Sequence, residues 1–91
     1  MHDHIIGLAW YNKTDWEEWK RISEDEIEDN YEDWLISAKA AKLSMENQGY
    51  TVEEVLISPA DFSQWCRKNR KRRDSANRSM YVQMLRSMGQ N

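Results

Sequence analysis

Apolar residues alternate in two short segments of the chain, and this alternation predicts two β-strands. In residues 5–11, Ile6, Leu8 and Trp10 alternate with a second set of mostly apolar side chains, so both faces of this strand are expected to be buried. Residues 50–57 are rich in β-forming residues, although two consecutive glutamates interrupt the alternation. The connection between the two segments is long and helical, which favours parallel pairing through a right-handed crossover. An antiparallel sheet, or a sheet completed by a partner, is the alternative.

Two helices are predicted between the strands. Thr14, with Glu17 three residues later, has the spacing of a capping box, which predicts a short helix that ends near Ser23. A longer apolar stripe follows over residues 27–45, with polar residues off the stripe. Gly49 is well placed to end this second helix in a left-handed conformation.

Two further helices are predicted after the second strand. Residues 58–61 read Ser-Pro-Ala-Asp, which places an N-cap residue before a proline at the first helical position and an acid soon after it. This helix is expected to run to about Asn69. Asp74 or Ser75 can start a final helix that Gly89 terminates. The predicted order is therefore β-α-α-β-α-α.

Residues 1–91 are expected to form a single small helix-rich α+β domain with a minimal two-stranded sheet. A chain of 91 residues can bury one modest core, and five tryptophans, four tyrosines and one phenylalanine supply the apolar area for it. Residues 1–4 are expected to be a flexible tail and residues 89–91 a frayed end. The sequence shows no signal-peptide pattern, no run of about 20 apolar residues and only one cysteine, which predicts a cytoplasmic protein that does not enter a membrane.

The sequence contains no constellation of reactive groups. Cys66 lies in an apolar helical stripe, which predicts a buried and inert thiol. His2 and His4 provide only two metal ligands, and the acidic run at residues 24–33 has an asparagine where a calcium loop requires glycine. There is also no nucleophile–base pair and no glycine-rich phosphate loop. We therefore expect no catalytic residue, no bound metal, no cofactor and no enzymatic activity.

Charge is segregated along the chain. Residues 1–62 carry 15 acidic and 5 basic side chains, a net charge of −10, whereas residues 63–91 carry 8 basic and 1 acidic side chain, a net charge of +7. Residues 67–73 contain six basic residues in seven, and Arg78 and Arg86 are expected to extend this basic run along the last helix. Such segregation predicts an electrostatic contact, either within the molecule or with a partner.

The sequence favours a small non-enzymatic protein-interaction or regulatory module that binds an unidentified protein through an aromatic and acidic face. Trp16 and Trp19 lie in a short acidic helix that is expected to be only half covered by the rest of the domain, and half-covered aromatic rings are typical of protein interfaces. The residues expected to contact the partner are Tyr11, Trp16, Trp19, Glu24, Asp25 and Glu28.

Nucleic-acid binding is the alternative function, because a dense cationic run binds phosphates and releases their counterions. The residues expected to carry it are Arg67, Lys68, Arg70, Lys71, Arg72 and Arg73. A sequence pI of about 5.3 favours neutralisation of the run, or contact with a protein, over nucleic acid. A homodimer, in which the basic run of one copy meets the acidic turn of another, is a further expectation.

Overall fold

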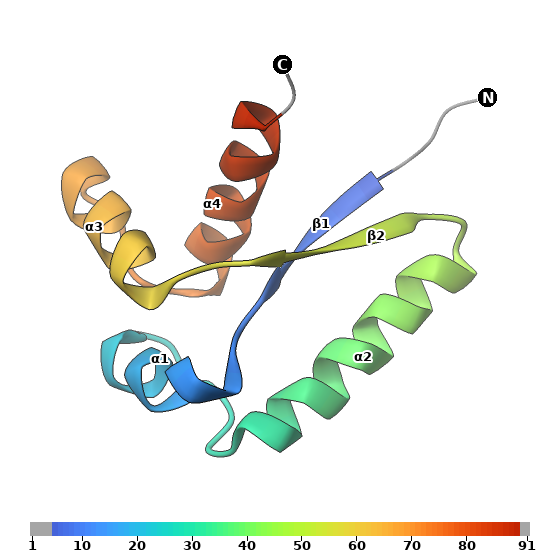
Figure 1. The fold of residues 1–91 in the computed structure, drawn as a ribbon, viewed down its shortest axis with the longest axis horizontal. Helices are drawn as coiled ribbons and strands as arrows, with labels where there is room; N and C mark the ends of the chain where they lie inside the picture. Colours follow the sequence, from blue (N-terminus) through green and yellow to red (C-terminus); the bar gives the residue numbers. More distant parts are fainter. Residues whose placement is uncertain (1–4, 90–91) are drawn as a thin grey trace.

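The computed structural model describes residues 5–89 and arranges them in two strands, a short 3₁₀ turn and four α-helices (Figure 1). In chain order these elements are β1 (Ile5–Trp10), η1 (Lys13–Asp15), α1 (Trp16–Ile22), α2 (Tyr31–Asn47), β2 (Thr51–Leu56), α3 (Pro59–Asn69) and α4 (Ser75–Met88). This is the predicted β-α-α-β-α-α order. The expected tail at residues 1–4, with His2 and His4, lies outside the described residues, as do residues 90–91 of the expected frayed end.

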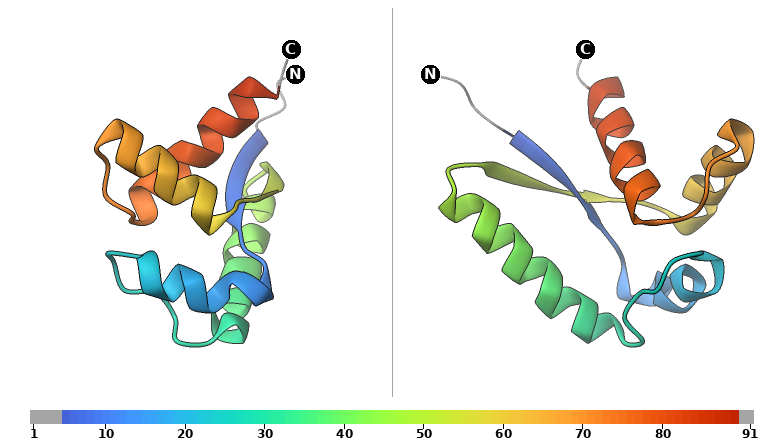
Figure 2. Two further views of the ribbon diagram at one scale, coloured as in Figure 1. Left: turned by 60° about the vertical axis from the view of Figure 1, so that its left-hand side comes forward. Right: turned by 180° about the vertical axis from the view of Figure 1, so that it is seen from behind.

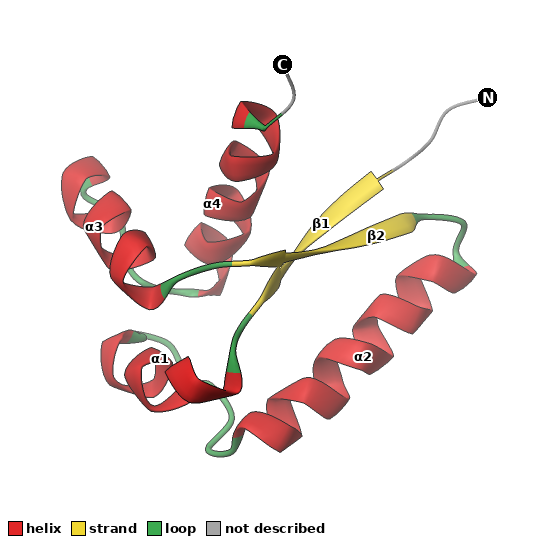
Figure 3. Cartoon of the chain, viewed as in Figure 1, coloured by secondary structure: helices red, strands yellow, loops and turns green. Residues whose placement is uncertain are grey.

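The two strands form a parallel pair, as the long helical connection predicts. Ile5 lies opposite Thr51 at one end of the pair, and Trp10 lies opposite Leu56 at the other. Successive side chains along a strand point to opposite faces of the sheet. Two neighbouring residues of β2 therefore show what covers each face. Figure 3 shows α2 on one side of the strand pair, with α3 and α4 on the other side.

Two ion pairs confirm this arrangement. Glu54 of β2 accepts a hydrogen bond from Lys42 Nζ of α2 at 2.9 Å. The preceding residue, Glu53, points to the opposite face and accepts from Arg86 Nε of α4 at 2.7 Å. The sheet is therefore a middle layer between helices, although it contains only two strands.

The hydrophobic core lies where α1, α3 and α4 converge beside the carboxyl ends of the strands (Figure 2). Trp19 of α1 contacts Phe62 of α3, with ring centroids 5.7 Å apart, and Phe62 in turn contacts Tyr81 of α4 at 5.6 Å. Val82 and Cys66 complete the group of deeply buried side chains. Ala38 is the only buried residue of α2, and this helix packs the partly buried Tyr31 and Trp34 against the core.

Most helix ends follow the local sequence signals. Ser58 Oγ accepts a hydrogen bond from the Asp61 backbone N–H at 3.3 Å, and Asp74 Oδ1 accepts one from the Asn77 backbone N–H at 3.1 Å. Gly49 has a φ of +98°, the left-handed conformation expected after α2.

The predicted cap at Thr14 is wrong. Residues 13–15 form the 3₁₀ turn η1, and α1 begins at Trp16 with Asp15 at its N-cap, where no side-chain hydrogen bond is made. The Asp15 backbone N–H donates to the Asn12 carbonyl oxygen at 3.1 Å, so Thr14 lies inside a helical turn and not at the extended position of an N-cap. The missing side-chain cap costs about 1 kcal/mol, which is small beside the burial of Trp16 and Trp19.

No helix within residues 5–89 is both long and apolar enough to cross a lipid bilayer.

Candidate functional site

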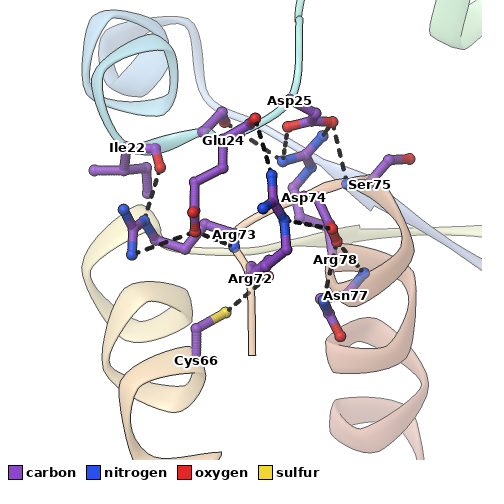
Figure 4. A network of polar contacts seen from close by, with 11 residues as sticks. Ile22, Glu24, Asp25, Cys66, Arg72, Arg73, Asp74, Ser75, Asn77 and Arg78 are labelled. Carbon is purple, nitrogen blue, oxygen red and sulfur yellow. Dashed lines mark hydrogen bonds and ion pairs between the residues drawn. The ribbon is translucent and has the colours of Figure 1, made fainter. Parts of the chain in front are cut away.

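The acidic turn after α1 packs against the connection between α3 and α4 (Figure 4). The Glu24 backbone N–H donates to the Arg73 carbonyl oxygen at 2.8 Å, and the Arg73 backbone N–H donates to Glu24 Oε2 at 2.9 Å. Arg73 Nε also donates to the Ile22 carbonyl oxygen at 2.7 Å. Two segments about 50 residues apart in the sequence are thus joined by main-chain and side-chain hydrogen bonds.

Asp25 and Arg78 form the most buried ion pair of the described chain. Arg78 donates from Nη1 and Nη2 to the two carboxylate oxygens of Asp25, at 3.1 and 2.7 Å, and the Ser75 backbone N–H adds a third hydrogen bond at 3.1 Å. Burial alone would raise the pKa of Asp25, but the hydrogen bonds and positive charge of Arg78 outweigh burial and lower this pKa. We call Glu24, Asp25, Arg73 and Arg78 the charge clasp.

The expected half-covered aromatic patch is not present, because its three rings are buried. Tyr11, Trp16 and Trp19 are 8 %, 3 % and 1 % exposed. The Tyr11 ring lies 4.8 Å from both the Trp19 and Trp34 rings, measured between centroids. Trp16 Nε1 donates to the Glu28 carbonyl oxygen at 3.1 Å, which fixes the ring against the acidic turn. The sequence placed Trp16 and Trp19 in a short amphipathic helix but did not show that the following turn folds over it.

These aromatic residues line a pocket of about 230 Å³ beside the charge clasp. The lining residues that the sequence assigned to partner binding are Tyr11, Trp16, Trp19, Asp25 and Glu28. Glu24, the sixth assigned residue, does not line the pocket and instead binds Arg73. The structure therefore gathers most of the predicted partner-binding residues, but around a small hollow and not on an open face.

The basic run divides into paired and unpaired residues. Arg73 Nη1 lies 3.6 Å from Glu24 Oε2, and Arg72 Nε lies 3.7 Å from Asp74 Oδ2. The other four cations are exposed and have no carboxylate within ion-pairing distance in the described part of the chain. These four residues, which we call the basic surface, are Arg67, Lys68, Arg70 and Lys71.

The expected extension of the basic run along the last helix is wrong. Arg78 is only 6 % exposed and is paired with Asp25, while Arg86 is paired with Glu53 of β2. Both arginines point from α4 toward acidic residues of other elements, so α4 adds no free cation to the basic surface. The sequence spacing could not reveal this, because each partner lies far away along the chain.

A groove of about 360 Å³ lies next to the basic surface, between the end of α1 and α3. Its lining residues are Arg21, Ile22, Ser63, Arg67, Lys71 and Arg73. Sequence reasoning missed Arg21 and Ser63, because they belong to two different helices and neither lies in a recognisable motif. Only the packing of α1 against α3 brings them to one place.

Cys66 is buried, as predicted, and 1 % exposed. Burial raises the pKa of the Cys66 thiol, and Sγ lies 3.7 Å from the Arg72 carbonyl oxygen. Among residues 5–89, no three His, Cys, Asp or Glu side chains are grouped to hold a metal ion.

No protein-family model matches this chain, and neither the curated proteins nor the solved structures include a match to it.

Proposed function

We propose that this protein is a non-enzymatic module that binds the phosphate backbone of a nucleic acid on its basic surface. The observation that carries the proposal is the division of the basic run. The charge clasp uses the acidic turn and Arg73 internally, while Arg67, Lys68, Arg70 and Lys71 stay exposed and unpaired in the described chain. Unpaired cations at adjacent positions attract the closely spaced charges of a phosphate backbone.

The net charge of −3 does not argue against this function, because the local field decides where a polyanion binds. Charges separated by more than about 8 Å are largely screened at physiological ionic strength. Glu24 and Asp25, which contact the connection after α3, are already paired with Arg73 and Arg78. The basic surface is therefore expected to act as a local site with moderate affinity.

The dependence of binding on salt tests the proposal. A labelled single-stranded oligonucleotide is titrated with the protein at several salt concentrations, and fluorescence anisotropy gives the affinity. We expect the slope of log K against log salt to become shallower by about 0.7 for each of Arg67→Ala, Lys68→Ala and Lys71→Ala.

Lys39→Ala is the matched control for this experiment. Lys39 is an exposed lysine on α2, far from the basic surface in the fold, and it makes no ion pair within residues 5–89. The slope of this variant should equal that of the wild type. Absence of binding to both RNA and DNA at low salt, or an equal loss in Lys39→Ala, would refute the proposal.

A second candidate function is recognition of a protein partner at the aromatic pocket, because five of the six residues expected to contact a partner line it. At about 230 Å³ the pocket is smaller than a typical drug-sized site, which suits one inserted side chain. The test is affinity purification after nuclease treatment, with Glu28→Lys compared with the wild type. This substitution keeps the backbone carbonyl that Trp16 uses. This candidate is supported if a partner protein still co-purifies with the wild type after nuclease treatment but not with the variant. If nuclease treatment removes the co-purified partner, nucleic-acid binding is supported instead.

A further inference from the structure

The groove between α1 and α3 has a net positive charge, because nearby acidic residues neutralise only some of its basic residues. Arg21 is paired with Glu18, since Arg21 Nε donates to Glu18 Oε1 at 2.9 Å, and Arg73 is paired with Glu24. Arg67 and Lys71 also line the groove and have no carboxylate within ion-pairing distance in the described chain. The groove therefore has an excess of about two positive charges.

The polar groups around the groove also favour an anion. The carbonyl oxygen of Ile22, at the end of α1, would repel an anion, but it already accepts a hydrogen bond from Arg73 Nε at 2.7 Å. Ser63 Oγ is buried and has no hydrogen-bond partner within residues 5–89. A buried hydroxyl without a partner is unfavourable, and rotation about χ1 would let it donate to a bound anion.

We infer that this groove binds the terminal phosphate monoester of a nucleic-acid strand, an inference that rests on the proposed function. A phosphate monoester carries a charge of about −1.5 to −2 at neutral pH, which matches the unbalanced charge of Arg67 and Lys71, whereas each internal phosphodiester carries only one negative charge. Arginine is suited to such a group because its planar guanidinium donates two parallel hydrogen bonds to phosphate oxygens. The rest of the strand then lies along the basic surface.

Two oligonucleotides of one sequence, one with a 5′-phosphate and one with a 5′-hydroxyl, test the inference at equal ionic strength and pH 7.5. We expect the phosphorylated strand to bind about tenfold more tightly, the effect of one or two added charge-assisted hydrogen bonds. Arg67→Ala and Lys71→Ala should remove this preference, and Ser63→Ala should reduce it. The preference should also shrink at pH 5.5, because the second pKa of a phosphate monoester is about 6.

Lys68→Ala is the matched control, since Lys68 is the exposed and unpaired neighbour of Arg67 but does not line the groove. This variant should bind both oligonucleotides more weakly and keep the ratio of their affinities. Circular dichroism and thermal unfolding of each variant check that the fold is intact.

The outcomes separate the two proposals. If both oligonucleotides bind equally, the inference is wrong and the proposed function stands. If neither binds at low salt, both are wrong. If the Arg67→Ala variant still prefers the 5′-phosphorylated strand, the terminal phosphate binds outside this groove and the inference is wrong. If a phosphoserine peptide binds while both oligonucleotides fail to bind, the groove recognises a phosphorylated protein, and the inference is overturned.

Discussion

Arg78 is the only buried charged residue of residues 5–89, and its contacts explain why the acidic turn is ordered against α4. Its guanidinium makes two hydrogen bonds to Asp25 and one to Ser23 Oγ, at 3.4 Å. A buried guanidinium without a counter-charge is strongly unfavourable. Asp25 is therefore expected to contribute strongly to the stability of the fold, although its own side chain is only partly buried.

Replacing Asp25→Asn should lower the free energy of unfolding by about 3 kcal/mol, because Arg78 would stay buried without a negative charge beside it. Urea unfolding followed by tryptophan fluorescence measures this loss. Glu26→Gln is the control, since Glu26 lies in the same turn, is exposed and makes no ion pair in the described chain. Its effect should be within about 0.5 kcal/mol. Equal losses in the two variants would contradict the role of the pair.

The same pair should contribute to acid sensitivity. Because the pKa of Asp25 is lower in the folded protein, its stabilising effect is fully present above the ordinary pKa of an aspartate, about 3.9, and is lost as the pH falls through the lowered folded value. Stability measured between pH 7 and pH 2 should therefore fall less steeply at the acid end in Asp25→Asn than in the wild type.

The residue types of this pair were visible in the sequence, but the pairing was not. Arg78 is separated from Asp25 by 53 positions, and its position just after the basic run made it look like part of a cationic surface. Cys66 shows the opposite case, since its position in an apolar helical stripe was enough to predict burial.

At the scale of elements, the packing of α4 on β1 depends on Gly7. A Cβ atom at this position would lie 2.9 Å from Val82 Cγ1 and would also clash with the Arg86 side chain. Gln83 Nε2, from the same helix, donates to the Gly7 carbonyl oxygen at 3.2 Å. The absence of a side chain at Gly7 therefore lets α4 approach the strand closely.

Gly7→Ala should destabilise the protein by about 1–3 kcal/mol, because Val82 is fully buried and has little room to move. The change in thermal or urea unfolding measures the effect. Gly89→Ala is the control, since Gly89 has a φ of −82° and a Cβ there would meet no atom closer than 3.6 Å. A loss as large in Gly89→Ala as in Gly7→Ala would show that steric overlap at β1 is not the cause.

The elements themselves followed local signals closely. Ser58 and Asp74 cap their helices as predicted, and the strands pair in parallel, the arrangement that a long helical connection favours. The prediction failed at Thr14 because the chain already turns at residues 13–15, where the Asp15 backbone N–H donates to the Asn12 carbonyl oxygen.

At the scale of the whole molecule, one core holds α1, α3 and α4 together, and Cys66 lies within it. Small domains of this size usually unfold in a single cooperative step. Exposure of the Cys66 thiol should therefore require opening of the whole core.

In native buffer, Cys66 should react with a thiol reagent at least about a thousandfold more slowly than in the unfolded chain, since the folded state is favoured by about 5 kcal/mol or more. With an aromatic disulfide as the reagent, the absorbance of the aromatic thiolate that it releases measures the reaction rate, with and without urea. Asp25→Asn should speed the native reaction by about tenfold for each 1.4 kcal/mol of stability that it loses, because the population of the opened state rises by that factor. Rapid reaction of the wild type in native buffer would show local opening at the end of α3.

The sequence alone determined the order of elements, most helix ends, the burial of Cys66 and the segregation of charge. Each of these depends on residue type and on position along the chain, without any contact between distant segments. Only the tertiary structure decided which charges are neutralised and which stay free, since Glu24 and Asp25 meet Arg73 and Arg78 across about 50 residues of chain. It likewise decided that the aromatic rings lie inside, because their burial requires surfaces from several elements at once.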